Sequence, residues 1–198
     1  MQQKSGLYSY RRNASVEPEL WRLGVRADLY DALMTSGECV HQMLARRIDP
    51  WFAACGHRMI HLGPRRDMDV YADLNIEVVT DPDQADFLLN TGPDAHLGEE
   101  DITPYLSMLE QCADQNLPMI CVNPDQQVIR GDRRLICAGA LASWYEAQDR
   151  EVRWIGKPYP EVYQLALSLL DVRPERVLAL GDALATHMVP SVRTVLWA

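Results

Sequence analysis

Residues 152–182 read VRWIGKPYPEVYQLALSLLDVRPERVLALGD and alternate between two kinds of pattern. The run from Val152 to Ile155 is predicted to be a strand that ends in a Gly-Lys-Pro turn. Pro160 to Leu170 places its apolar side chains on one side of a helix. Arg176 to Leu180 is a second buried-type strand, which ends in Gly-Asp. A strand, a helix and a strand in this order are typical of an α/β architecture with a parallel sheet.

The same alternation extends through the rest of the chain. Glycine, proline and other turn residues separate the segments, and the opening stretch before Ser15 has no clear period. The pattern predicts strands at Leu29–Thr35, Arg58–Leu62, Ile76–Val79, Phe87–Asn90 and Pro118–Val122, and a hairpin at Gln127–Ile136. It predicts helices at Ser15–Leu23 with Ser15 as N-cap, Glu38–Arg47, Met68–Leu74, Thr103–Gln115 with Thr103 as cap, and Ala138–Gln148.

Composition excludes several classes of protein. The 198 residues carry 19 Lys and Arg against 28 Asp and Glu, a formal charge of −9. A nucleic-acid partner would require clustered positive charge, so we expect none. No apolar run approaches the ~20 residues of a membrane span, and the N-terminus lacks the apolar stretch of a signal peptide. We therefore expect a cytoplasmic protein that does not bind a membrane.

Cysteine and histidine do not form metal-ligand patterns. The five cysteines are widely spaced, without a CxxC pair, and are expected to be reduced and mostly buried. His57 and His61 share one face if their segment is a strand. Without a third ligand nearby, we interpret them as packing and surface residues.

Four predicted strands end in polar or turn residues, where open α/β sheets bind ligands. These ends are Thr35-Ser36-Gly37, Asn123-Pro124-Asp125, Gly156-Lys157-Pro158 and Gly181-Asp182. The ammonium of Lys157 could neutralise a phosphate or carboxylate, and Asp182 is an oxygen ligand suited to Mg²⁺. Because one helix and one strand separate these two residues, we expect them on neighbouring parallel strands at the same sheet edge. The alternative is that each is an ordinary solvated loop residue.

Two motifs resemble a known family. IGKPYPEVYQLAL, followed by RVLALGDALATHM, resembles the C-terminal half of a haloacid dehalogenase (HAD) superfamily phosphatase of the NagD-like branch. CVNPD and ICAGALASWYE are similar to the cap lobe of that branch and to the helix that leads back into the core. LYDALMTSGE, HLGPRRD and DPDQADFLLNTG also fit, in the same order. The resemblance covers residues 15–189.

The resemblance implies a Rossmann-like core with an inserted α/β cap, here a partial core at 1–55 and 153–198 and a cap at 56–152. It implies Mg²⁺-dependent hydrolysis of phosphate monoesters through an aspartyl-phosphate, with a small phosphorylated molecule as substrate. Lys157 would hold the phosphoryl oxygens and the charge of the nucleophile, and Asp182 would bind Mg²⁺. Asn123 and Asp125 would face the substrate from the cap. Ser9 is the candidate for the Ser or Thr of the second family motif.

Two positions depart from the family pattern. The family nucleophile lies in an Asp-x-Asp motif at the end of the first strand, but no Asp precedes Asp28. His187 stands where the family has an acidic residue after Gly-Asp. Both ends of the sequence therefore resemble a truncated copy, and we expect a HAD-like hydrolase by descent that is inactive in this chain. The alternative is a non-catalytic remnant whose cap binds a phosphorylated ligand or a protein partner, including a second copy in a homodimer.

Two loop motifs have more than one interpretation. Asn123-Pro124-Asp125 offers hydrogen-bonding groups to a substrate, yet the same triplet is a common turn. Arg65-Arg66 is interpreted as surface charge, with contact to a substrate phosphate as the alternative.

Overall fold

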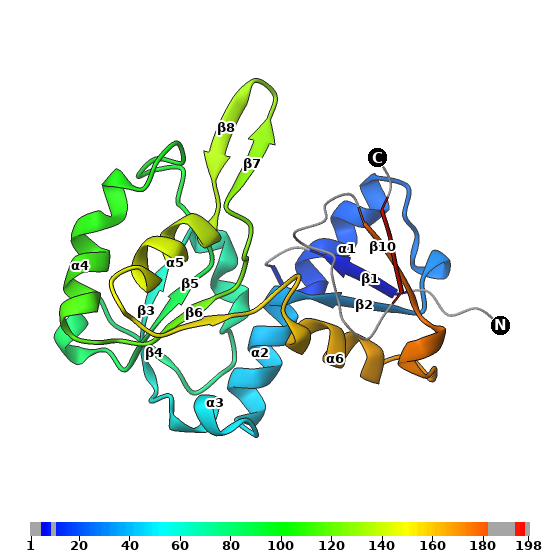
Figure 1. Cartoon of the computed structure of the whole chain (residues 1–198), viewed down its shortest axis with the longest axis horizontal. Coiled ribbons are helices and arrows are strands. Elements are labelled where there is room, and N and C mark those ends of the chain that lie inside the picture. Colours follow the sequence, from blue (N-terminus) through cyan, green and yellow to red (C-terminus); the bar gives the residue numbers. More distant parts are fainter. Residues whose placement is uncertain (1–4, 9–10, 182–192, 197–198) are drawn as a thin grey trace. The chain divides into compact units, whose positions relative to one another are not determined.

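The structure, a computed structural model, describes residues 5–8, 11–181 and 193–196 (Figure 1). Its contacts divide the chain into two compact units. We name Met1–Cys39 together with Ile155–Ala198 the split unit, because its two segments are far apart in the sequence. We name Val40–Trp154 the continuous unit. Both units combine helices with parallel strands, as the sequence pattern predicted.

The split unit contains two pairs of parallel strands. β1 runs beside β2, with Ser5 opposite Ala32 and Tyr8 opposite Thr35, and β10 runs beside β11. Its elements are β1 (Ser5–Tyr8), α1 (Asn13–Arg22), η1 (Ala27–Leu29), β2 (Ala32–Thr35), α6 (Pro160–Ser168), η5 (Pro174–Arg176), β10 (Leu178–Gly181) and β11 (Arg193–Leu196). Helix α2 (Ser36–Arg46) begins in this unit and ends in the other.

Helices α1 and α6 cover the β1–β2 pair. Val16 and Leu20 on α1 form a buried cluster with Leu33 of β2, and Tyr30 packs against it. Helix α6 contacts both strands and buries Val162, among others. Burial of such aliphatic side chains contributes about 1.5–3 kcal/mol each, so this packing fixes the strand ends where the polar residues lie.

The continuous unit is built on a five-stranded sheet in the order β4-β3-β5-β6-β9, in which every pair is parallel. Its elements are α3 (Pro50–Ala54), β3 (Arg58–Leu62), η2 (Arg65–Val70), β4 (Glu77–Val78), η3 (Pro82–Gln84), β5 (Phe87–Asn90), η4 (Thr103–Tyr105), α4 (Leu106–Asp114), β6 (Met119–Cys121), β7 (Gln127–Arg130), β8 (Arg133–Ile136), α5 (Ala138–Glu146) and β9 (Val152–Trp154).

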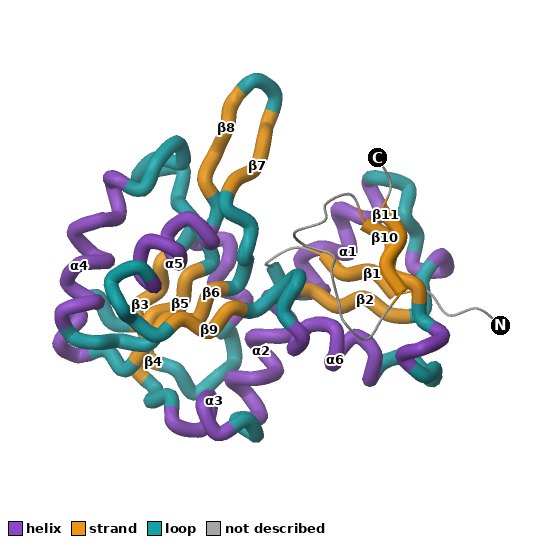
Figure 2. Tube along the Cα trace, in the orientation of Figure 1, coloured by secondary structure: helices purple, strands orange, loops and turns teal. Residues whose placement is uncertain are grey.

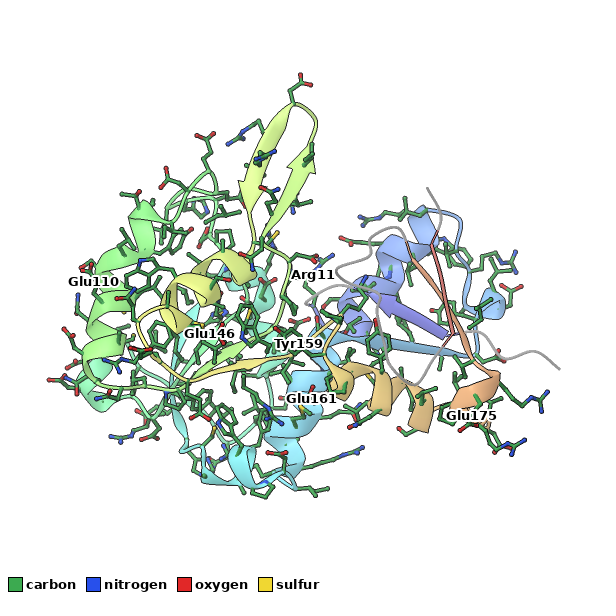
Figure 3. All side chains as sticks on the ribbon, in the orientation of Figure 1. Arg11, Glu110, Glu146, Tyr159, Glu161 and Glu175 are labelled. Atoms are coloured by element: carbon green, nitrogen blue, oxygen red, sulfur yellow. The ribbon has the colours of Figure 1, made fainter. Side chains whose placement is uncertain are left out.

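The core of this unit lies between the sheet and helices α4 and α5 (Figure 2). Every residue of the central strand β5 is buried, as expected for a strand in the middle of a parallel sheet. Tyr145 of α5 is fully buried and donates a hydrogen bond to the Leu117 carbonyl (2.8 Å). Trp154 donates from Nε1 to Oε1 of Glu146 (2.9 Å), which is labelled in Figure 3. Helix α5 is thus joined to the sheet through both its buried and its exposed face.

Two predicted helix caps were wrong. Helix α1 begins at Asn13, and its N-cap is Arg12 rather than Ser15. The Asn13 side chain donates to the Leu33 carbonyl (2.9 Å), a tertiary contact that extends the helix toward β2. Thr103 lies within a short 3₁₀ turn, and α4 begins only at Leu106 with Tyr105 as its N-cap. The Asp101 carboxylate accepts from the Thr103 amide (2.7 Å), so the neighbouring aspartate supplies the local cap.

The predicted placement of Lys157 and Asp182 after neighbouring strands was also wrong. β9, which precedes Lys157, pairs with β6 in the continuous unit. β10, which precedes Asp182, pairs with β11 in the split unit. The chain passes from one unit to the other between these two strands, so the strand-helix-strand pattern does not form one sheet here.

Two other predictions, of the hairpin and of free, mostly buried cysteines, were confirmed. The hairpin forms over β7 and β8, with Gly131 at its turn in the left-handed region (φ 61°). All five cysteines are free thiols, and only Cys137 is partly exposed. Among the described residues, no helix is long and apolar enough to cross a membrane.

Candidate functional site

The carboxyl end of β2 places buried polar side chains in the split unit. Thr35 and Ser36 are both buried, which is unusual for hydroxyl side chains. Thr35 Oγ1 accepts a hydrogen bond from the Glu38 amide (2.9 Å) and so satisfies a free N–H in the first turn of α2. The sequence therefore starts a helix immediately after the strand and fixes the geometry of this loop.

An arginine–carboxylate pair lies beside this loop. Arg12 contacts Glu38 through two atoms, with Nε 3.0 Å from Oε2 and Nη2 3.4 Å from Oε1. The exposed fractions of the two side chains are 27% and 12%, so water screens the pair only in part. The two-point contact holds the guanidinium in one orientation at the carboxyl ends of β1 and β2. This pair could not be predicted from the sequence, because 26 positions separate its members.

Lys157 lies on the short connection between β9 and α6. Gly156 precedes it with φ of 134°, a conformation that favours glycine. The Tyr159 amide donates to the Gly156 carbonyl (2.7 Å), which closes a turn around the lysine. Lys157 is partly buried, and no described residue forms a hydrogen bond or an ion pair with its ammonium. A partly buried cation just before a helix N-terminus is suited to hold an anion.

The remaining predicted residues of the split unit are not placed. Ser9, Asp182 and His187 lie outside the described residues. Within the part of the chain that the structure describes, no three His, Cys, Asp or Glu side chains gather into a group that could hold a metal ion. The described donor set therefore does not by itself fit a Mg²⁺ site, which requires several oxygen ligands.

Asn123 and Asp125 lie in the continuous unit, in the loop that follows β6. Asn123 Oδ1 accepts from the Asp125 amide (3.2 Å), so this side chain stabilises the turn. The Asp125 side chain is exposed, and its carboxylate remains accessible. The two interpretations of the triplet thus divide between its residues: Asn123 shapes the turn, and Asp125 is accessible to a ligand.

The N-terminus of α5 holds this loop. The Gly139 amide donates to the Asp125 carbonyl (3.0 Å), and the Cys137 amide donates to the Gln126 carbonyl (3.0 Å). A Cβ atom on Gly139 would lie 2.3 Å from the Pro124 carbonyl oxygen, so only glycine allows this approach. Burial raises the pKa of the adjacent Cys121 to about 12, which keeps it a neutral thiol.

His61 and its two side-chain partners lie at the carboxyl ends of β3 and β5. His61 Nε2 lies 3.0 Å from Thr91 Oγ1, and His61 Nδ1 lies 3.3 Å from the Tyr71 hydroxyl. The rings of His61 and Tyr71 meet edge to face, with centroids 5.1 Å apart. Burial lowers the pKa of His61 from 6.5 to about 4. The charge of Asp94 raises the same pKa, but by less. His61 is therefore neutral at physiological pH. In the sequence, the glycines of His61-Leu62-Gly63 and Asn90-Thr91-Gly92 indicate that a turn follows each of these two strands.

The comparisons with known proteins rest on solved structures. No family model and no curated protein sequence matches the chain. A haloacid dehalogenase-like hydrolase from Brucella suis 1330 matches 99% of this chain and 76% of its own, with 28% identity and a TM-score of 0.85. A p-nitrophenyl phosphatase from Archaeoglobus fulgidus matches 95% of this chain and 70% of its own, with 20% identity and a TM-score of 0.71. NagD from Escherichia coli K-12 matches 96% of this chain and 72% of its own, with 19% identity and a TM-score of 0.68.

The fold is therefore that of the haloacid dehalogenase-like phosphatases. Among these, the chain is similar in structure to the branch that includes NagD, and the resemblance predicted from its sequence is confirmed. The likeness extends over both units, because the matched structures cover nearly the whole chain.

Proposed function

We propose that this protein is a phosphatase-like hydrolase by descent that binds a small phosphorylated molecule. The observation that carries the proposal is Lys157: a partly buried ammonium, without a described ion-pair partner, at the turn that leads into α6. In this role Lys157 holds the phosphoryl oxygens of the ligand. The hydrolase and phosphatase titles of the structural neighbours support the same ligand chemistry.

The predicted cap, residues 56–152, lies within the continuous unit and acts as the cap in this proposal. Asp125 is the cap residue that we propose to contact a substrate, as the family resemblance implies, and Asn123 shapes the loop that carries it. Ser9 is a further ligand contact, by its match to the second family motif. A location in the cytoplasm is part of the same proposal.

We expect the 198-residue chain to lack turnover. The family reaction needs an aspartate nucleophile that takes the phosphoryl group and so divides the displacement into two steps. The first Asp of this sequence is Asp28, and β1 contains none. Binding groups cannot replace a missing nucleophile. Hydrolysis of p-nitrophenyl phosphate with Mg²⁺ should stay at the buffer rate, and sustained hydrolysis that Lys157→Ala abolishes would contradict this expectation.

The alternative function is that of a non-catalytic binding protein. The β7–β8 hairpin favours a protein partner, because Ile129 is 71% exposed on a strand whose residues are all exposed. A second copy of this chain is one such partner. Sedimentation of the intact chain and of Ile129→Lys tests whether the hairpin binds a second copy. A dimer that the substitution dissociates favours this alternative, and an intact chain that is monomeric counts against it.

The test of the phosphate site is thermal. Phosphate or sulfate at millimolar concentration should raise the melting temperature of the intact chain and raise that of Lys157→Ala much less. Arg173→Ala removes an exposed cation of the same unit and serves as the matched control. Its melting temperature should rise with phosphate as much as that of the intact chain. Equal shifts in the intact chain and Lys157→Ala, or no shift in either, would remove Lys157 from an anion site.

Mg²⁺ should bind this chain only weakly. The resemblance leaves Asp182 as the one matched metal ligand, and His187 stands where a second acid is expected. Imidazole is a poor ligand for Mg²⁺, which prefers several oxygens. Calorimetric titration with millimolar Mg²⁺ should therefore give little saturable heat in the intact chain and in Asp182→Ala alike. Tight binding of one Mg²⁺ ion that disappears in Asp182→Ala would show a complete metal site and would support the hypothesis of an active enzyme.

A further inference from the structure

The β7–β8 hairpin stands away from the five-stranded sheet of its own unit (Figure 1). β7 and β8 form a sheet of two strands only, and every residue of β7 is exposed. Arg130 lies opposite Arg133 at the two-residue turn, and Ile129 lies opposite Arg134. A two-stranded sheet has two outer edges, and the backbone N–H and C=O groups along such an edge can pair with a further strand.

The hairpin concentrates positive charge on an acidic chain. Residues 127–136 hold three arginines and one aspartate, whereas the whole chain has a formal charge of −9. Arg130 and Arg133 lie directly opposite each other, and like charges in this position destabilise a strand pair. Glu100 offsets Arg133, but Arg130 and Arg134 form no ion pair with a described residue. An arrangement that costs local stability indicates a function for these arginines outside the hairpin.

One edge of the hairpin is already covered by an acidic segment of the same chain. The Ile136 amide of β8 donates a hydrogen bond to the Glu99 carbonyl (2.8 Å). The next residue, Glu100, accepts from Arg133 Nη2 at its Oε1 (2.9 Å). The segment before η4 therefore binds β8 through one backbone hydrogen bond and one charge-assisted side-chain contact. This contact identifies the chemistry that pairs with the hairpin, namely a stretch of chain that offers both carbonyls and carboxylates.

The other edge, along β7, has no such cover among the described residues. In a hairpin that is closed by a two-residue turn, the two residues beside the turn bond to each other, so the backbone groups of the next residue, Ile129, point outward. No described backbone group outside the hairpin bonds to the N–H or C=O of Ile129. Its side chain is 71% exposed, and Arg130 beside it is exposed as well. The open edge thus combines backbone hydrogen-bonding groups, an apolar side chain and a cation.

We propose that the outer edge of β7 binds an acidic segment of a partner protein, which adds to the hairpin as a third strand. The backbone of the segment pairs with the outward groups of Ile129, and its carboxylates contact Arg130 and Arg134. An apolar side chain of the segment covers Ile129. This proposal deepens the alternative function given above and rests on its placement of a protein partner at the hairpin. It does not depend on Lys157.

The charge of the chain favours this partner over other anionic ones. Nucleic acids and anionic lipid surfaces carry dense negative charge over a wide area, which the acidic remainder of the chain repels. A single added strand touches only the hairpin and avoids that repulsion, which is screened beyond about 10 Å. A second copy that paired hairpin to hairpin would place its own arginines against Arg130 and Arg134. Its like charges would therefore oppose the contact.

Binding of a fluorescent peptide of alternating glutamate and valine to the full chain tests the proposal. The peptide should bind more weakly as the salt concentration rises, and it should shift the amide NMR signal of Ile129. Arg130→Gln should weaken the affinity about tenfold, the effect of losing one charge-assisted contact. Arg46→Gln removes an exposed arginine of α2 and is the matched control, which should keep the affinity of the intact chain. A peptide of alternating lysine and valine should not bind.

The hairpin should stay folded in Arg130→Gln, because the substitution removes one of two opposed like charges. Amide signals of Val128 and Leu135 that match those of the intact chain would verify this. Peptide binding that Arg130→Gln leaves unchanged would place the peptide elsewhere and overturn the proposal. An Ile129 amide that does not respond to bound peptide would exclude pairing at the β7 edge.

Two further results would assign the hairpin to a different partner and so overturn the proposal. The first is binding of heparin, or of vesicles that contain phosphatidylserine, through Arg130 and more tightly than the peptide. The second is a dimer that Ile129→Lys dissociates in a chain that does not bind the peptide, which would leave the alternative function intact with a second copy as the partner. A loss of phosphate stabilisation in Lys157→Ala reports on the phosphate site only.

Discussion

Gly139→Ala is expected to lower the free energy of unfolding by about 3 kcal/mol, at the upper end for an overpacked site. The new Cβ atom would lie 2.3 Å from the Pro124 oxygen and 2.5 Å from the Asp125 oxygen. Both are backbone atoms, so no side chain can rotate away to relieve the contact. The loop after β6 must move, and the hydrogen bond from the Gly139 amide to the Asp125 carbonyl is lost. Urea denaturation monitored by tryptophan fluorescence measures the change.

Gly131→Asn is the matched control. Gly131 also has a special conformation (φ 61°), but nothing lies within 4 Å of its Cβ position, and Asn tolerates the left-handed region. This substitution should change the free energy of unfolding by less than about 0.5 kcal/mol. If Gly139→Ala were as mild as Gly131→Asn, the close approach of α5 to the loop would not exist in solution.

The free energy of unfolding should depend on pH through His61. Because the pKa of His61 is about 4 in the folded chain and 6.5 ordinarily, the unfolded chain binds the proton more readily. The stability that neutral His61 contributes is complete above pH 6.5 and is lost as the pH falls from there toward 4. Between pH 7 and pH 5 the loss should be about 2 kcal/mol, since each pKa unit corresponds to about 1.4 kcal/mol.

The comparison of two variants isolates this residue. Carboxylates also titrate near the lower end of the range, but they do so in every variant and cancel in the difference. His61→Gln should lower stability at pH 7 and flatten its decline toward pH 5. His57→Gln, which changes an exposed histidine bonded to the Asn75 carbonyl, should keep the decline of the intact chain. An equal slope in His61→Gln and the intact chain would contradict a buried neutral His61.

Short apolar strands of the continuous unit could be predicted from the sequence. Arg58–Leu62 and Phe87–Asn90 were predicted with the observed bounds, because each is a short apolar run closed by turn residues. The caps of α1 and α4 could not, since they depend on tertiary contacts such as the one from Asn13 to the Leu33 carbonyl. Local propensity favoured Ser15 as the N-cap of α1. The contact between Asn13 and Leu33, which are 20 positions apart, instead favours an earlier start of the helix.

The candidate site was predictable only where its residues follow strands. Lys157, Asn123 and Asp125 stand out in sequence because they follow apolar runs. The side-chain pairs of the same candidate region could not be predicted, because their members are distant in sequence: Arg12 and Glu38 are 26 positions apart, and His61 and Thr91 are 30 apart. The separation of β9 and β10 into different units was equally hidden, because a strand, a helix and a strand usually form one parallel unit.

The division of the chain into a continuous and a split unit has a consequence for its synthesis. Residues 40–154 leave the ribosome as one uninterrupted segment that contains its whole sheet and core, so this unit can fold while translation continues. The first 39 residues must wait, because α6, which packs on β1 and β2, is made near the C-terminus. Strands β1 and β2 therefore spend the longest time as exposed nascent chain. A chaperone that protects this protein during translation would be needed at its N-terminal segment first.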